Sequence, residues 1–450
     1  MALPTAKILA QQLRDGHRDP LDVVEEVFDS ITAAGDAALF IRQCKTRAEA
    51  EARASRERLR VGNPASLLDG VPLAWKDLFD LQGTVTTAGS ALLRGSAPAT
   101  KDAALVNAAM RAGMVTIGTV NMTEFAYSGI GLNPHYGTPW NPRDPKIARA
   151  PGGSSSGCGV VVARGIVPIS IGTDTGGSVR IPAAFNGVVG YKTSTGHHPM
   201  QGVFPLSPTL DTLGPLAATV EDCVLVDAAL RGLAAPHAVA ADIAALDFVI
   251  PDAVLFDDLD PAIAAAFDAT ERRLSAAGAR VRRIALPELR ETAGLIAKIG
   301  PLASVEAMDI HAARLADPAQ RDQIDPRVVR RILMAEKMTA VDLFRLLSHR
   351  KLQIAAVNAK LGAAFLICPT TPSVAMPIAP LEADVELFFK NNFRTLRNAA
   401  LGNFLDWCGL SIPNGSDADA MPTALMICAP HGQDRALLSA GLAIEAIVRG

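Results

Sequence analysis

The chain has 450 residues, of which 49% are hydrophobic and 20% charged, and its formal net charge is −3. This composition excludes an intrinsically disordered chain and allows a large buried core. The 43 basic and 46 acidic residues nearly balance. Because no long basic run occurs, a nucleic-acid partner has no electrostatic support.

No stretch approaches the roughly 18 consecutive apolar residues of a transmembrane helix, so none is predicted. Residues 1–16 lack the apolar run of a secretory signal peptide. The six cysteines are scattered without a C-x-x-C pair, as is typical of buried free thiols in a reducing compartment. We therefore expect a cytoplasmic protein that does not bind a membrane.

Residues 4–34 are predicted to form two helices, because apolar residues recur there at helical spacing. From about Leu67 the pattern changes to alternating strands and helices. A short apolar run at 71–75 ends at Lys76. Asp102 is the expected N-cap of a helix that ends at Gly113, and 114–120 is predicted to be a buried strand.

The proline-rich segment 133–157 is predicted to be a loop, followed by a helix at 157–164, a strand at 167–171 and a glycine-rich turn at 172–178. Later elements are an amphipathic helix from Ile263 to Leu274 and a strand at 363–368. The Ala-rich segment 232–244 is the best candidate for a connection between two halves. Strands separated by helices predict an α/β fold with a buried sheet covered on both faces.

Two Gly/Ser-rich turns lie close together, GGSSSG at 152–157 and GGS at 176–178. A single cluster of this kind is usually a flexible linker or an anion-binding nest. Two such clusters between apolar helices and strands disfavour a linker. No G-x-x-x-x-G-K-[ST] motif is present, and no G-x-G-x-x-G follows a strand, so nucleotide binding lacks its usual support.

Two other serine patterns could suggest a nucleophile. Residues 153–157 match G-x-S-x-G with Ser155 at the centre, but that turn needs an apolar strand directly before it, and 141–151 contains three prolines instead. Ser348 and Lys351 match S-x-x-K without its companion motifs. No H-E-x-x-H motif, Cys/His cluster or carboxylate-rich loop is present, so neither a metal nor another cofactor is expected.

The longest motif joins GGSSSG at 152–157 to GTDTGGSVRIPAAFNGVVGYK at 172–192, and it resembles the signature block of the amidase signature family. LDGVPLAWKD at 68–77 resembles that family's lysine motif, and 202–215 resembles the continuation of the block. Ser154 and Ser178 are 24 residues apart, the interval that the family uses. Strong likeness covers about 65–225, with weaker likeness at 368–372 and 411–415.

The resemblance implies one amidase domain over residues 1–450. N-terminal helices would occupy 4–60, the signature core about 65–225, and a C-terminal α/β part about 245–450. The implied architecture is a single large α/β/α sandwich, in which helices cover both faces of a central mixed β-sheet.

The resemblance also implies a Ser-Ser-Lys triad, with Ser178 as nucleophile, Ser154 as bridging serine and Lys76 as base. The peptide bond before Ser154 would be cis. The oxyanion hole would be built from the backbone N–H groups of Thr175, Gly176, Gly177 and Ser178.

These residue types suit the chemistry. A serine hydroxyl becomes a good nucleophile when a base takes its proton, and a lysine can be that base only when it is neutral. Burial lowers a lysine pKa from about 10.4, and the apolar run before Lys76 suggests burial. Ser154 can both donate and accept a proton. The sequence therefore predicts an amidohydrolase that forms an acyl-enzyme on Ser178 and releases ammonia or an amine.

The sequence leaves several classes of substrate open. Ile181 stands where the A subunits of tRNA amidotransferases usually carry Gln, which argues against glutamine deamidation. The chain is too short for the extra domain of typical allophanate hydrolases. Small amides, amino-acid amides and hydrazides remain, and a ureide or carboxybiuret stays open. The alternative function is an amidotransferase A-type subunit that supplies ammonia to a partner complex.

Five residues are expected to line the pocket, with core packing as the alternative for the four apolar ones: Glu124, Phe125, Trp140, Ile181 and Phe204. The loop at 193–201 departs from the family pattern. His197 and His198 replace a position where Arg is frequent, and each is either a surface residue or a pocket donor. A small-molecule amide is the expected partner, and a homodimer stays open.

Overall fold

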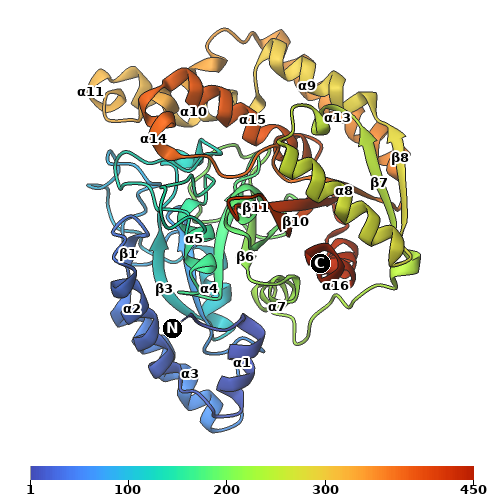
Figure 1. Ribbon diagram of the computed structural model, residues 1–450. Helices are drawn as coiled ribbons and strands as arrows, with labels where there is room; N and C mark the ends of the chain where they lie inside the picture. The colour runs from blue at the N-terminus through green and yellow to red at the C-terminus, as the bar shows by residue number, and fades with distance from the viewer. Residues whose placement is uncertain (1) are drawn as a thin grey trace.

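The computed structural model describes residues 2–450, in which eleven strands form one sheet (Figure 1). In sheet order they are β1 (Phe40–Gln43), β3 (Val115–Val120), β2 (Pro72–Lys76), β4 (Ile169–Asp174), β6 (Thr212–Ala217), β5 (Val189–Lys192), β10 (Cys408–Ser416), β11 (Pro422–Ala429), β9 (Phe365–Pro369), β7 (Asp247–Asp252) and β8 (Arg280–Ala285). β3, β2 and β4 run parallel, as do β9, β7 and β8, and the strands between these groups pair antiparallel. The predicted mixed sheet is confirmed.

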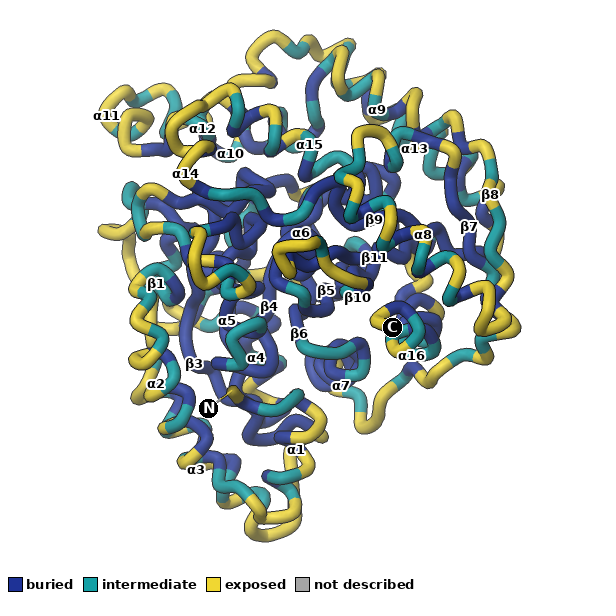
Figure 2. Tube along the Cα trace, in the orientation of Figure 1, coloured by how far each residue is buried: buried dark blue, intermediate teal, exposed yellow. Residues whose placement is uncertain are grey.

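The alternating directions of side chains along β9 show that helices cover both faces of the sheet. In β9, Ile367 packs with residues of α8 (Pro261–Ala276) and α16 (Asp434–Arg449), whereas Leu366 and Cys368 pack with residues of α9 (Pro287–Ile299), α13 (Ala340–Leu361) and α15 (Val385–Phe404). Successive strand residues point to opposite faces, so these two clusters lie on opposite sides of the sheet. Figure 2 shows the central strands buried between helices whose outer surfaces are exposed, whereas the edge strands β1 and β8 are partly exposed.

The elements around the signature core lie close to their predicted positions. α5 (Ser156–Ala163) and α6 (Arg180–Asn186) pack on each other, and α7 (Val220–Leu230) contacts α4 (Ala104–Arg111) and α16. α1 (Ala6–Arg14) and α2 (Pro20–Ala34) are the two helices predicted at the N-terminus, followed by α3 (Lys45–Arg60). The remaining elements are η1 (Glu124–Ala126), η2 (Ile243–Ala245), η3 (Val254–Phe256), α10 (Leu302–Ala316), α11 (Pro318–Arg321), α12 (Pro326–Ile332), η4 (Leu333–Ala335) and α14 (Ile378–Ala383).

The prediction that Asp102 caps a helix is wrong. α4 has Ala103 at its N-cap and receives no side-chain cap. The Asp102 carboxylate instead accepts hydrogen bonds from the Arg47 guanidinium and from the Gln82 N–H, both at 2.7 Å. A tertiary ion pair to α3 therefore replaces the local cap.

All six cysteines carry free thiols. Across residues 2–450, none of the helices combines the length and the apolar character needed to cross a bilayer.

Candidate active site

Lys76 ends strand β2 between β3 and β4, and its side chain is fully buried. Its Nζ lies 2.7 Å from Ser154 Oγ and 2.7 Å from Thr173 Oγ1. Burial lowers the pKa of Lys76 to about 7, although Cys158, Asp211 and Asp174 act in the opposite direction. A substantial fraction of this amine is therefore neutral at neutral pH.

Ser154 lies in the turn that leads into α5, and the peptide bond between Gly153 and Ser154 is cis. Ser154 is fully buried, and its carbonyl accepts a hydrogen bond from the Thr123 N–H at 3.0 Å. A Cβ on Gly153 would lie 2.6 Å from the Ser128 carbonyl oxygen. Only glycine fits before Ser154, because the backbone of another loop passes so close.

Ser178 lies in the turn between β4 and α6, and its carbonyl accepts a hydrogen bond from the Ser155 N–H at 3.3 Å. This contact joins the two glycine-rich turns. Ser178 lines a cavity of about 100 Å³ together with Thr175 and Gly176. Its hydroxyl forms no hydrogen bond to any residue in 2–450, so it faces the cavity without a protein partner. Catalytic hydrogen bonds of this kind commonly tighten when substrate binds.

The turn before Ser178 is shaped by Asp174. Its buried carboxylate accepts hydrogen bonds from the Gly177 N–H at 2.8 Å, the Val179 N–H at 3.1 Å and the Arg180 guanidinium at 2.9 Å. Burial alone would raise the pKa of Asp174, but Arg180 holds it well below its usual range. Asp174 is therefore charged and fixes the turn.

This network corrects one of the predicted oxyanion donors. The Gly177 N–H is already engaged by Asp174, so it is not free to bind a substrate oxygen. The N–H groups of Thr175, Gly176 and Ser178 donate to no acceptor in the described chain. Three of the four predicted donors therefore have no protein acceptor, and their residues line the cavity.

A second buried carboxylate supports the same turn from the loop before β6. Asp211 accepts a hydrogen bond from the Thr175 hydroxyl at 2.5 Å and from the N–H groups of Leu206 and Ser207 at 2.9 and 3.0 Å. Burial raises the pKa of Asp211 to about 6. Asp174, Arg180 and Asp211 all lie within the sequence motifs, but the motifs alone assign them no role.

The structure does not bring the five predicted pocket residues to the cavity beside Ser178. Ile181 is fully buried and packs behind Gly177, and Phe125 stacks on Phe204 with ring centroids 5.8 Å apart. The buried Phe125 and Ile181 fit the alternative of core packing, whereas Phe204 is half-buried and lines a separate hollow. Trp140 is 55% exposed on the surface, so neither interpretation was right for it.

Glu124 is also outside the cavity. It is fully buried, and its carboxylate accepts hydrogen bonds from the Asp325 N–H at 2.6 Å and from the Ser90 hydroxyl. Glu124 therefore joins the segment before Ser128 to the start of α12. Its contacts are structural.

Residues from the C-terminal half complete the cavity wall, among them Arg331 at the end of α12. The residue is 7% exposed, and its Nη1 donates to the Tyr127 carbonyl at 2.9 Å. Its Nε has no hydrogen-bond partner, and no carboxylate in residues 2–450 lies within 4.0 Å of the guanidinium. Arg331 is thus a buried cation without a counter-ion at the cavity that holds Ser178.

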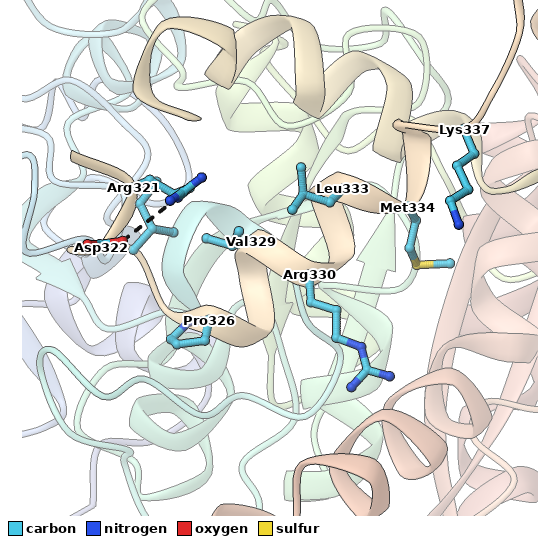
Figure 3. Close-up of a pocket in the computed structure, with 9 residues that line it drawn as sticks. Arg321, Asp322, Pro326, Val329, Arg330, Leu333, Met334 and Lys337 are labelled. Carbon is cyan, nitrogen blue, oxygen red and sulfur yellow. Dashed lines mark ion pairs between the residues drawn. The ribbon is translucent and has the colours of Figure 1, made fainter. Parts of the chain in front are cut away.

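A larger hollow of about 670 Å³ lies around α11 and α12 and contains none of the triad (Figure 3). Arg321, Val329, Arg330 and Lys337 are among its lining residues. Helix α12 thus presents Arg330 to this hollow and the next residue, Arg331, to the cavity beside Ser178. The two sites are distinct.

Comparison with known proteins identifies the same family as the sequence motifs. Residues 22–438 match the family model described as Amidase. The chain is 37% identical over 415 residues to a 2-amino-5-chloromuconic acid deaminase of Comamonas testosteroni, covering 89% of this chain and 87% of that protein. It is 33% identical over 437 residues to the A subunit of a glutamyl-tRNA(Gln) amidotransferase of Acidothermus cellulolyticus, covering 88% and 85%.

A crystal structure of an amidase superposes with a TM-score of 0.87 at 29% identity, covering 99% of this chain and 100% of that chain. The likeness therefore spans the whole sheet as well as the signature turns. The chain belongs to the amidase family and is a hydrolase of amide C–N bonds.

Proposed function

We propose that this amidase uses Ser178 as nucleophile, Ser154 as proton bridge and Lys76 as base. The observation that carries the proposal is the fully buried Lys76, with Nζ 2.7 Å from the Ser154 hydroxyl and a pKa lowered by burial to about 7. A lysine near its neutral form can accept a proton. Ser154 is followed directly by Ser155, whose N–H donates to the Ser178 carbonyl at 3.3 Å, so the bridging serine belongs to a turn that contacts the turn of Ser178.

The proposed reaction begins when neutral Lys76 takes the proton of Ser154 while Ser154 takes that of Ser178. The Ser178 oxygen attacks the substrate carbonyl carbon, and the N–H groups of Thr175, Gly176 and Ser178 stabilise the resulting oxyanion. Ser154 then returns a proton to the departing nitrogen, and ammonia or an amine leaves. Water attacks the acyl-enzyme by the same relay, which releases the carboxylic acid and restores Ser178.

The substrate that we propose is a small amide whose other end carries a carboxylate. A buried guanidinium without a protein counter-ion is costly, and a substrate carboxylate would neutralise it with charge-assisted hydrogen bonds. Arg331 occupies that position in the cavity wall. The name of the Comamonas relative, which acts on a muconic acid, agrees with an acidic substrate. The free thiols of the six cysteines fit a cytoplasmic location.

The nucleophile is tested by substitution and by covalent labelling. We expect Ser178→Ala to lower kcat for a hydrolysed amide by roughly three orders of magnitude or more, because the triad acts as a unit. A fluorophosphonate should label the wild-type protein and not Ser178→Ala. Ser155→Ala is the matched control, since Ser155 occupies the centre of the G-x-S-x-G pattern. Labelling that persists in Ser178→Ala and disappears in Ser155→Ala would contradict the assignment.

Arg331 is tested with a pair of substrates of equal length. Succinamate has a carboxylate at its far end, and succinamide has a neutral amide there. We expect the wild-type protein to prefer succinamate, and Arg331→Met to lower kcat/KM for succinamate by roughly 10²-fold while changing that for succinamide only a few-fold. Arg331→Lys should restore part of the preference. An equal loss for both substrates would mean that Arg331 only supports the cavity wall.

A further inference from the structure

A cluster of three histidines and one aspartate lies outside the catalytic cavity and has no part in the proposed reaction. His197 and His198 come from the loop after β5, Asp227 from the middle of α7, and His237 from the connection after α7. Asp227 is fully buried and His198 is 4% exposed. None of the four lines the cavity beside Ser178.

The donor atoms of this cluster converge on one carboxylate. The Nε2 atoms of His197 and His198 lie 2.8 and 3.1 Å from Asp227 Oδ1, and the Nε2 of His237 lies 3.4 Å from Asp227 Oδ2. One ligand atom from each of His197, His198 and Asp227 falls within 4.8 Å of the others. Ligands of a tetrahedral zinc ion at roughly 2.0–2.2 Å are themselves about 3.3–3.6 Å apart, so only small movements would be needed.

Hydrogen bonding alone satisfies this cluster poorly. Although His198 Nε2 is buried and close to Asp227 Oδ1, it makes no hydrogen bond of acceptable geometry, and the buried Nδ1 of His237 has no partner. His197 faces a carboxylate on each side, because its Nδ1 lies 3.8 Å from Asp434 Oδ2. A metal-bound histidine usually directs its second ring nitrogen toward a carboxylate in this way.

One cation already approaches the cluster. Arg231 Nη1 lies 3.4 Å from Asp227 Oδ2 and 3.4 Å from His237 Nε2. Its side chain is 36% exposed, so it can turn toward solvent when another cation binds. Arg231 would therefore compete with a metal for the same carboxylate.

We propose that His197, His198 and Asp227 bind a divalent transition-metal ion of the zinc type, with His237 placed to supply a fourth ligand. Such an ion would join the loop at 193–201, helix α7 and the connection at 232–242. The four residues lie outside the cavity that Ser178 lines, so the ion would be structural. Imidazole and carboxylate ligands without a thiolate suit Zn²⁺, Co²⁺ and Ni²⁺.

The experiment uses the full chain without a histidine tag, after removal of metal with EDTA. We expect calorimetric titration with ZnCl₂ to show one site per chain, Zn²⁺ to raise Tm, and Co²⁺ to give visible absorption bands of a tetrahedral site. His198→Gln should weaken Zn²⁺ binding by more than about 10²-fold. His431→Gln is the control, because this half-exposed histidine lies outside the cluster and should leave binding unchanged.

Two partly exposed positions keep the test decisive if His198→Gln does not fold. Arg231→Ala should strengthen Zn²⁺ binding, because it removes the competing cation, and His237→Gln should weaken it. A wild-type protein that takes up no stoichiometric Zn²⁺, or a folded His198→Gln variant with unchanged affinity, would overturn the proposal. Loss of Zn²⁺ binding in His431→Gln alone would place the ion elsewhere and would overturn it as well.

Discussion

At the scale of single residues, the proposed chemistry depends on where Lys76 is buried. Its neighbours are hydroxyl groups and apolar side chains, and it forms no ion pair with Asp174 or Asp211. The carboxylate of Asp174 is instead engaged by Arg180. Burial lowers the pKa of Lys76, and because no carboxylate pairs directly with its ammonium group, the more distant charges of Asp211 and Asp174 do not offset this effect.

This environment predicts the pH dependence of turnover. Below about pH 7 Lys76 is mostly protonated and cannot accept a proton, so kcat/KM should fall about tenfold per pH unit. Above that pH it should reach a plateau. kcat/KM should therefore rise with pH, as expected for a base that acts only when it is neutral. A pH profile with a substrate that has no group titrating between pH 5 and 9 measures this dependence. A profile that falls as pH rises through 7 would contradict this role for Lys76.

The same pKa affects folding. The unfolded chain, with a lysine pKa of about 10.4, binds more protons than the folded chain between about pH 7 and pH 10.4. The contribution of Lys76 to the free energy of unfolding therefore increases with pH across that window. Burial of Lys76 thus lowers the free energy of unfolding most below about pH 7, where the buried amine is charged.

At the scale of elements, the turn at 175–178 places two adjacent glycines in different surroundings. Gly177 has φ +124°, and a Cβ there would lie 2.6 Å from both Ala399 Cβ and Ile181 Cδ1. Around Gly176 the nearest atoms are the Ala400 and Leu396 side chains at 3.8 Å, and both line the cavity. Gly176 therefore borders the cavity, whereas Gly177 is required by the fold.

We therefore expect the two alanine variants to fail differently. Gly177→Ala should lower the free energy of unfolding by roughly 2–3 kcal/mol, because it combines backbone strain with overpacking. Gly176→Ala should keep stability within about 0.5 kcal/mol and raise KM, because its methyl group occupies cavity space. Urea unfolding and steady-state kinetics on both proteins separate the effects. Equal destabilisation of the two variants would show that Gly176 and Gly177 do not have these different roles.

At the scale of the whole molecule, the proposed site is assembled from both halves of one sheet. The triad comes from the turns and strand ends of β2, β4 and α5, whereas Arg331 and Leu396 reach the cavity from α12 and α15. β5 of the first half pairs with β10 of the second. Every residue of the proposed site comes from this chain, so we expect it to hydrolyse an amide without a partner protein.

This completeness predicts activity without a partner. Purified protein, as a monomer or a homodimer on size exclusion, should release ammonia or an amine from an acidic amide. Lys76→Met should remove that activity. Release from glutamine only in the presence of a second protein would instead favour the amidotransferase A-type alternative, which the Acidothermus relative represents.

The fold class and, through the family likeness, the mixed sheet could be predicted from the amino-acid sequence, and the sequence motifs also name the residues of the proposed triad. Those conclusions depended on contiguous motifs, in which local spacing controls local geometry. Lys76, Ser154 and Ser178 could be named because each lies in such a motif.

The side chains that surround Ser178 could not be predicted in this way, because they come together only when the chain folds. Arg331 carries no local signal of its own, and its missing counter-ion is visible only once α12 packs against Tyr127. The expected pocket residues Phe125 and Ile181 are core residues, since apolar side chains near a site in sequence cannot be assigned to cavity or core by pattern alone. His197 and His198 likewise acquire a candidate role only when α7 brings Asp227 between them, because ligands from separate segments share no sequence spacing.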